Sequence, residues 1–160
     1  MVTGRYDITK QGLLLIQEYE DFRAKAYLDI KGVPTIGYGT TYYPDGTKVE
    51  LGDVCTRSQA EVWFAHDSKA IDAFLDRSVT QKKLTQNQFD ALASFIYNIG
   101  RSAFNGSAMY KLIKAGEMKG AAEQFLVWNK VTKNGKKVAS DGLTNRRKKE
   151  RALFLKGMVA

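Results

Sequence analysis

Three polar residues near the N-terminus are spaced for chemistry. Glu20, Asp29 and Thr35 lie in the irregular stretch "EYEDFRAKAYLDIKGVPTIGYGTT" at 18–41. Cleaving a glycosidic bond requires one carboxyl group that gives a proton to the leaving oxygen and an ionised one that activates water or stabilises positive charge. Glu20 borders apolar residues, which favour its protonated form, whereas Asp29 beside Lys31 stays ionised more readily. Thr35 is expected to hold a water against Asp29, because a β-branched residue in a strand fixes the direction of its hydroxyl.

The elements around these residues change type along the chain. An apolar stripe after the N-cap residue Thr9 predicts a first helix that ends near Asp21. From 26 to 41, aromatic and β-branched residues punctuated by glycine predict short strands. A turn at 44–46 and a third short strand are expected before the pattern ends at Gly52.

The rest of the chain has helical patterns. Thr56 and Gln59 form a predicted capping box for a helix at about 57–77. Thr85 and Gln88 repeat the signature ahead of "FDALASFIYNIG", whose apolar character predicts a buried central helix that its last glycine ends. Further helices are expected at about 107–115, 117–128 and 144–156, with a polar loop, "TKNGKKVASDG", before the last of them.

Composition excludes several classes of protein. A chain of 160 residues with 44% hydrophobic composition can bury a core in one compact domain or in two lobes. No stretch approaches the roughly 18 to 20 apolar residues of a membrane span, and "GLLLI" is too short for a signal peptide, so we expect synthesis in the cytoplasm. A single cysteine, Cys55, and a single histidine, His66, predict neither a disulfide nor a metal site, and no cofactor is expected.

The net charge of +8 is unevenly distributed. Residues 1–129 hold fifteen basic and fifteen acidic residues, whereas residues 130–160 hold ten basic and two acidic ones. Such a C-terminal region suits nucleic acid, an anionic membrane or an acidic polymer such as a cell wall. Nucleic acid is not expected, because no helix-turn-helix or aromatic RNA-binding signature accompanies the charge.

Three segments in order resemble one family. The spacing of Glu20, Asp29 and Thr35 within "AYLDIKGVPTIGYGTT" resembles the phage-type lysozymes of glycoside hydrolase family 24, the endolysins of tailed phages. The segment "QFDALASFIYNIGRSAFNGSAMYKLIKAG" at 88–116 is similar to the central-helix region of that family, and "DGLTNRRKKERALF" at 141–154 is similar to its closing element. The resemblance therefore covers most of the chain.

The resemblance implies a peptidoglycan muramidase that hydrolyses the β-1,4 bond between N-acetylmuramic acid and N-acetylglucosamine. Glu20 would be the general acid, Asp29 the base or electrostatic partner, and Thr35 the residue that orients water. Inversion of configuration is implied, for which the carboxyl groups lie roughly 6.5 to 9.5 Å apart. The chain departs from many relatives in having Asp21 where they have glycine after the catalytic glutamate.

The resemblance also implies substrate-binding residues. An arginine of "NRR" would pair with the catalytic Glu20, and both Arg146 and Arg147 match that position. The implied substrate-binding residues are Tyr38, Gly39, Asn98, Phe104, Ser107 and Arg146.

The implied architecture is an α+β, lysozyme-like fold. A small β lobe at about 22–55 would be joined by a helix at about 57–77 to a helical lobe made of 1–21 and about 78–160. The glycan would lie in the cleft between the lobes, and the protein would be a monomer. It would wait in the host cytoplasm until the inner membrane opens and then act in the periplasm or cell wall to lyse the host.

Other functions remain to be distinguished. A lytic transglycosylase would act on the same bond and leave an anhydro product, although it does not need the water-positioning pair Asp29 and Thr35. A basic antibacterial protein would disrupt membranes through the C-terminal segment "NRRKKERALFLKGMV", by contact with an anionic membrane or lipopolysaccharide. Alternatively, this last helix packs its apolar side on the larger lobe and its lysines attract the anionic wall.

Overall fold

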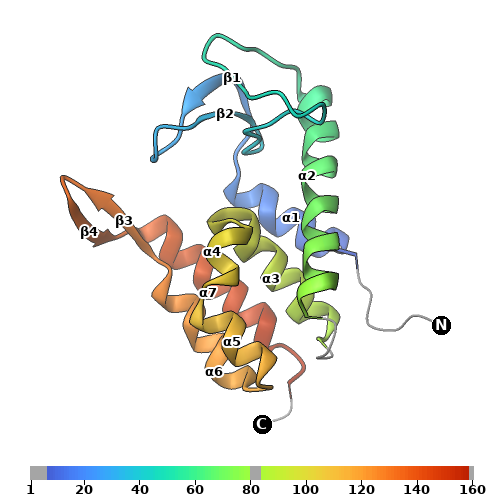
Figure 1. Cartoon of the computed structure of the whole chain (residues 1–160), viewed down its shortest axis with the longest axis vertical. Coiled ribbons are helices and arrows are strands. Elements are labelled where there is room, and N and C mark those ends of the chain that lie inside the picture. Colours follow the sequence, from blue (N-terminus) through green and yellow to red (C-terminus); the bar gives the residue numbers. More distant parts are fainter. Residues whose placement is uncertain (1–6, 80–83, 159–160) are drawn as a thin grey trace. The chain divides into compact units, whose positions relative to one another are not determined.

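The computed structural model describes residues 7–79 and 84–158. The chain divides into two compact units, which we call the β unit (Leu14–Ala70) and the helical unit (Met1–Leu13 and Ile71–Ala160) (Figure 1). The helices are α1 (Lys10–Tyr19), α2 (Arg57–Ser78), α3 (Gln86–Ile99), α4 (Arg101–Asn105), α5 (Ala108–Lys114), α6 (Met118–Gln124), the 3-10 helix η1 (Phe125–Val127) and α7 (Asp141–Leu155). The strands are β1 (Arg23–Leu28), β2 (Pro34–Gly37), β3 (Lys130–Lys133) and β4 (Lys136–Ala139). Helices with small antiparallel sheets confirm the predicted α+β class.

The first helix begins where the sequence predicts. The hydroxyl oxygen of Thr9 accepts a hydrogen bond from the N–H of Gly12 at 3.4 Å, as an N-cap residue does. The buried carboxylate of Asp90 in turn accepts hydrogen bonds from the N–H of Thr9 (3.0 Å) and from its hydroxyl. The helix ends at Tyr19, slightly before the predicted end near Asp21.

The β unit contains one antiparallel pair, β1 with β2. The predicted third strand is wrong, because only an isolated bridge joins Tyr42 to Lys48 there. Pro44 has no N–H to give to a ladder, and the carboxylate of Asp45 accepts hydrogen bonds from the N–H (2.9 Å) and the hydroxyl (2.7 Å) of Thr47. These local bonds compete with strand pairing.

The end of β2 packs closely against α2. Gly37 has a positive φ of 66°, and a Cβ atom added there would lie 3.0 Å from the Cβ atom of Ala60. Only glycine fits this approach without strain. The hydroxyl of the next residue, Tyr38, donates a hydrogen bond to Glu61 (3.1 Å) and accepts one from Arg57 (3.0 Å). The strand that carries Thr35 is thereby fixed to α2.

Both predicted capping boxes are confirmed. The N–H of Thr56 donates to the side chain of Gln59 (2.9 Å), and the N–H of Gln59 donates to the hydroxyl of Thr56 (3.1 Å). Thr85 and Gln88 make the same reciprocal pair at the start of α3, and Gly100 is its C-cap residue with a φ of 94°. These helix starts are determined by residues within one turn.

The helical unit has an aromatic core around α3, which packs against α7. The ring of Phe95 makes edge-to-face contacts with Phe104, Phe125 and Trp128, and Phe125 also contacts Phe154. Such pairs add stability beyond the burial of their apolar area. In the described ranges, no helix combines the length and hydrophobicity that crossing a membrane requires.

The predicted polar loop before the last helix is wrong, because this segment forms the β3–β4 hairpin. Asn134 and Gly135 occupy its turn with φ values of 51° and 78°. Two successive positive φ values match the type I′ turn of tight hairpins, for which Asn-Gly is a strong signal. The last helix also starts earlier than the predicted Thr144, because the hydroxyl of Ser140 caps α7 by accepting a hydrogen bond from the N–H of Leu143.

Asp72, on the part of α2 that belongs to the helical unit, has an unusual environment. Its carboxylate accepts a hydrogen bond from the N–H of Ile8 at 2.9 Å. Burial, and then the neighbouring carboxylates of Asp7, Asp76 and Asp90, raise the pKa of Asp72 to about 6 against the opposing effect of that hydrogen bond. Because the pKa is higher in the folded state than in the unfolded chain, folding is favoured by proton uptake.

We therefore predict that Asp72 makes stability fall with rising pH. Its contribution is fully present below about pH 4, the ordinary range of an aspartate, and is lost as the pH rises through about 6. Asp72→Asn keeps an acceptor for the Ile8 N–H and does not titrate. The free energy of unfolding of the variant relative to wild type should therefore be higher at about pH 7 than at about pH 4, by on the order of 1 kcal/mol after allowance for solvent screening. Urea unfolding at both pH values measures this difference. Parallel pH profiles for the two proteins would contradict it.

Candidate active site

The predicted catalytic residues all lie in the β unit. Glu20 directly follows α1, and its N–H still donates a hydrogen bond to the carbonyl oxygen of Ile16 at 2.9 Å. Asp29 follows β1 and begins the turn into β2, which carries Thr35. Glu20 and Asp29 are partly exposed, whereas Thr35 is buried. A helix end and a hairpin therefore supply the three side chains.

The peptide groups of Val33 connect Asp29 to Thr35. The N–H of Val33 donates to Oδ1 of Asp29 at 2.9 Å, and the carbonyl oxygen of Val33 accepts from the hydroxyl of Thr35 at 2.8 Å. Oδ1 of Asp29 also accepts from the N–H of Lys31 at 2.8 Å. The carboxylate and the hydroxyl are thus oriented by the same turn.

Tyr27 is a residue at this site that the sequence reasoning missed. It lies directly opposite Thr35 in the β1–β2 ladder, so the two side chains share one face of the hairpin. Asp29 follows two residues later, which is the spacing of side chains on the same side of an extended chain. The guanidinium carbon of Arg23 lies 4.1 Å from the centroid of the Tyr27 ring.

The charges of both candidate catalytic carboxyl groups affect the phenol of Tyr27. Its pKa is raised above the ordinary value, first by burial and then by the negative charge of Glu20. Asp29 raises it further, while Arg23 acts in the opposite direction. The alternation of side chains along a strand could have placed Tyr27 on the same side as Asp29 from sequence alone. The position of Tyr27 opposite Thr35, in contrast, depends on the register of β1 and β2.

The predicted substrate-binding residues differ in exposure. Asn98, in the last turn of α3, is exposed, and Gly39 is partly exposed with a φ of 87°. The other four are buried, with exposed fractions of 6% for Tyr38, 0% for Phe104, 3% for Ser107 and 2% for Arg146. Asn98 and Gly39 thus keep surface that a sugar can touch, and their roles stay predictions.

Phe104 and Ser107 have structural roles that account for their burial. The ring of Phe104 contacts Phe74, Phe95 and Tyr110, with centroids 6.1, 6.5 and 5.1 Å away. The hydroxyl of Ser107 donates to the carbonyl oxygen of Phe104 at 2.7 Å and caps α5 by accepting from the N–H of Tyr110 at 3.1 Å. The side chain of Phe104 has no exposed surface, and its predicted place near a sugar subsite stays a prediction.

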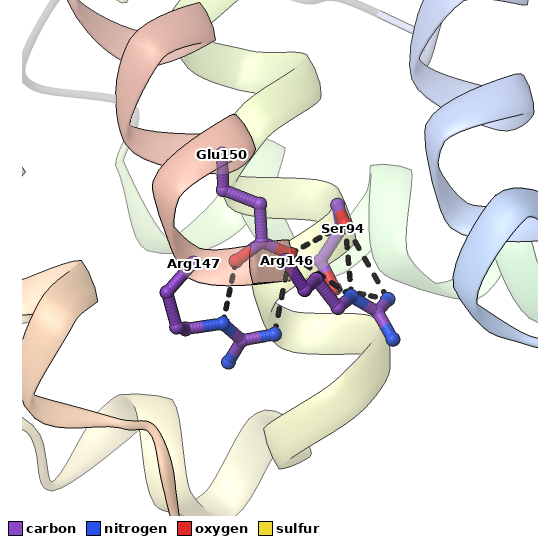
Figure 2. Close-up of polar contacts among 4 residues, drawn as sticks. All are labelled: Ser94, Arg146, Arg147 and Glu150. Atoms are coloured by element: carbon purple, nitrogen blue, oxygen red, sulfur yellow. Dashed lines mark hydrogen bonds and ion pairs between the residues drawn. The ribbon is translucent and has the colours of Figure 1, made fainter. Parts of the chain in front are cut away.

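Arg146 and Arg147 belong to a buried polar cluster on α7 and α3 (Figure 2). Nε of Arg146 lies 3.2 Å from the carboxylate of Glu150, and Nε of Arg147 lies 2.8 Å from it. The hydroxyl of Ser94 donates to the same carboxylate at 2.5 Å, and its backbone carbonyl accepts from Arg146 at 3.0 Å. The guanidinium of Arg147 also lies over the ring of Phe95, 4.9 Å from its centroid. Both arginines therefore bind Glu150.

In this cluster the positive charges of two guanidinium groups lie beside the carboxyl group of Glu150. Burial raises the pKa of the Glu150 carboxyl, while the charges of Arg147 and Arg146 act in the opposite direction. The guanidinium groups of arginine keep their charge in proteins. The predicted pairing of Arg146 or Arg147 with Glu20 joins residues of different units and stays a prediction.

The site therefore offers acid–base chemistry by side chains. The charges of Glu20 and Asp29 both raise the pKa of the Tyr27 phenol. The hydroxyl of Thr35 is oriented by the same turn that orients Asp29. This is the set of groups that glycoside hydrolysis uses. In the described part of the chain, His, Cys, Asp and Glu side chains form no group of three or more that is arranged to bind a metal ion.

Comparison with known sequences identifies relatives of this chain. A family model described as Phage lysozyme matches residues 17–150. An endolysin of Acyrthosiphon pisum secondary endosymbiont phage 1 is 40% identical over 147 residues, which cover 92% of this chain and 97% of that protein. An endolysin of Salmonella phage P22 is 38% identical over 148 residues, with coverage of 92% and 97%.

Solved structures give the same result. An endolysin from Escherichia coli O157:H7 phage FAHEc1 superposes with a TM-score of 0.83 at 40% identity and covers 99% of both chains. The muramidase domain of SpmX from Asticaccaulis excentricus superposes with a TM-score of 0.79 at 34% identity, covering 94% of this chain and 99% of that one. The lysozyme-like fold predicted from the motifs is confirmed. The chain belongs to the phage lysozyme family.

Proposed function

We propose that this protein is a peptidoglycan muramidase that hydrolyses the β-1,4 bond between N-acetylmuramic acid and N-acetylglucosamine during phage lysis of a bacterial host. As a lysozyme it is a glycoside hydrolase, and the endolysin relatives and the muramidase neighbour support the substrate. The observation that carries the proposal is the turn in which Val33 orients both Asp29 and Thr35 by hydrogen bonds, with Glu20 at the end of α1 in the same unit. The lytic transglycosylase and the membrane-disrupting protein are not favoured.

Glu20 is the proposed general acid. Its carboxyl proton passes to the glycosidic oxygen as the bond from that oxygen to the anomeric carbon breaks, which leaves positive charge on the sugar ring. Asp29, as an ionised carboxylate, stabilises that charge and accepts a proton from the attacking water. Water supplies the hydroxyl group of the new reducing end, so the products are two shorter glycans.

The hydrogen bonds of the turn suggest how the water is oriented. The hydroxyl group of Thr35 donates its proton to the carbonyl oxygen of Val33. The hydroxyl oxygen of Thr35 can therefore interact with a water only as an acceptor. Oδ1 of Asp29 is occupied by backbone donors, which leaves Oδ2 to accept the second proton of the same water. A water that donates to both groups turns its lone pair toward the anomeric carbon.

The cell wall is the proposed place of action, as for the endolysin relatives, and release from the cytoplasm by opening of the inner membrane stays a prediction. The apolar side of α7 is used in packing, because Phe154 is fully buried with its ring 5.5 Å from that of Phe125. This burial favours a packing role for α7 over insertion into a membrane. Lys148 on its exposed side is proposed to attract the anionic wall.

The products test the proposed reaction. Purified peptidoglycan is digested with wild type, and the released fragments are analysed by mass. Fragments that end in reducing N-acetylmuramic acid are expected, since water adds across the cleaved bond. Anhydro fragments would identify transglycosylation and remove the role assigned to Asp29. A suspension that does not clear would contradict the proposed function.

A further prediction concerns the phenol of Tyr27. Because burial and nearby carboxyl groups raise its pKa, the hydroxyl stays protonated and can donate a hydrogen bond at the site. Tyr27→Phe keeps the ring against Arg23 but removes this donor, so kcat should fall roughly tenfold with KM within about twofold, which corresponds to about 1.4 kcal/mol of transition-state stabilisation. The pH profile of kcat should shift as well.

The control for Tyr27 is Tyr42→Phe, the same change at a side chain that is 52% exposed. Kinetics on purified peptidoglycan at several pH values compare the two variants. If Tyr27→Phe and Tyr42→Phe have the same kcat and the same pH profile, then Tyr27 has no role in positioning the catalytic groups.

A further inference from the structure

The β3–β4 hairpin carries a concentration of positive charge that the fold does not use. Residues 130–139, "KVTKNGKKVA", include four lysines and no acidic residue. The ammonium group of Lys130 donates to the side chain of Asn129 at 2.9 Å. Within the described ranges, no carboxylate pairs with Lys133, Lys136 or Lys137. Figure 1 shows the hairpin projecting from the helices of its own unit.

The register of the hairpin brings like charges together. Lys133 lies directly opposite Lys136, next to the turn, and Lys137 lies opposite Thr132. Like charges directly opposite across a ladder are destabilising, and a two-stranded hairpin is marginally stable by itself. The lysines therefore weaken the hairpin in isolation, whereas an anionic partner between their ammonium groups would stabilise it.

The distribution of charge indicates the shape of the partner. Adjacent positions of a strand point to opposite faces, so Lys136 and Lys137 present charge on both faces of the hairpin. All residues from 132 to 139 are exposed, and their only large apolar side chain is Val138. A membrane surface would contact one face and would favour large apolar groups for insertion. Charge on both faces instead suits a chain with separated anionic groups.

We propose that the β3–β4 hairpin is an auxiliary substrate-binding element that attracts the free carboxylates on the peptide side chains of peptidoglycan. This inference rests on the proposed function, because it assigns the hairpin to the same polymer. Lysine is suited to the task, since its ammonium group is a mobile point charge that can follow irregularly spaced carboxylates. Exposed charges of this kind are screened by salt, so the attraction must weaken as ionic strength rises.

The test variant neutralises the tip of the hairpin: Lys133→Gln, Lys136→Gln and Lys137→Gln together. The matched control removes the same charge from exposed helix positions by Lys69→Gln, Lys111→Gln and Lys119→Gln. Clearing of purified peptidoglycan at about 50 mM salt gives an apparent KM, which should rise about tenfold in the hairpin variant and less than about threefold in the control. The kcat values should agree within about twofold.

Modified substrate and vesicles identify the partner. Amidation of the peptide carboxylates should remove the difference in KM between wild type and the hairpin variant, and so should about 0.5 M salt. Equal KM values for the hairpin and control variants on unmodified peptidoglycan would overturn the inference. Loss of binding to anionic phospholipid vesicles, with unchanged binding to peptidoglycan, would assign the hairpin to a membrane and also overturn it.

Two further readouts keep the outcome unambiguous. The melting temperature of the hairpin variant should not fall below that of wild type, because the change removes repulsion between lysines. The salt dependence of the wild-type KM on native and amidated peptidoglycan requires no variant, and a KM independent of salt on native peptidoglycan would overturn the inference. Failure of the proposed function has a different signature, since wild type would then not cleave peptidoglycan at all.

Discussion

Replacement of Glu20 by glutamine is expected to lower kcat on purified peptidoglycan by about a thousandfold or more. Glutamine keeps the size of the side chain at the end of α1 but cannot give a proton to the glycosidic oxygen. General acid–base catalysis contributes roughly a hundred to ten thousandfold to enzymatic rates, and departure of an unprotonated sugar oxygen is difficult. Binding of peptidoglycan should persist, because the change leaves the rest of the site in place.

The control is Glu18→Gln, the same chemical change at an exposed position two residues earlier in α1. It should clear peptidoglycan at a rate within about twofold of wild type. Turbidity, with a binding assay by co-sedimentation, separates loss of chemistry from loss of affinity. Clearing by Glu20→Gln at the wild-type rate would show that Glu20 is not the acid, and it would reopen the assignment of Asp29 and Thr35.

Replacement of Glu150 by glutamine should destabilise the protein by about 3–5 kcal/mol. The Glu150 carboxylate is fully buried and lies 3.2 Å from Arg146 and 2.8 Å from Arg147. Glutamine removes the carboxylate that the two buried guanidinium groups share, and breaking a buried ion pair by removing one partner is strongly destabilising. For a chain of this size, the melting temperature should fall by about 10 °C.

Glu123→Gln provides the matched control. It removes the partner of Arg151 at an exposed ion pair, which should cost less than about 1 kcal/mol. Calorimetry or thermal unfolding followed by circular dichroism compares the two variants. A melting temperature for Glu150→Gln within about 2 °C of wild type would show that Glu150 carries no charge in the folded protein, and that the arginines are compensated by other groups.

Local signals in the sequence predicted most of the helical elements. The capping pairs Thr56 with Gln59 and Thr85 with Gln88 occur where expected, because each depends on residues within a single turn. The family resemblance drawn from the motifs is confirmed by the comparisons. The β3–β4 hairpin was missed although Asn134 and Gly135 signal a type I′ turn, because the lysine-rich strands around them lack the usual apolar pattern.

The candidate site was predicted in part. Glu20, Asp29 and Thr35 follow from residue type and spacing, and the structure shows that Val33 connects the last two. Tyr27 was missed because its place opposite Thr35 is a property of the β1–β2 register. The full burial of Phe104 was not predicted, because sequence shows that a residue is aromatic without showing which side of a short helix faces the core.

By itself the sequence determined where the capped helices α1, α2 and α3 begin, which residues are the candidates for acid–base chemistry and which family the chain belongs to. These properties depend on residue identity and on neighbours a few positions away. The tertiary structure decided that Arg147 and Glu150 are buried as a pair and that Tyr27 lies opposite Thr35 in the β1–β2 ladder. Burial and electrostatic environment arise when distant segments exclude water from one another, and no local pattern specifies which segments those are.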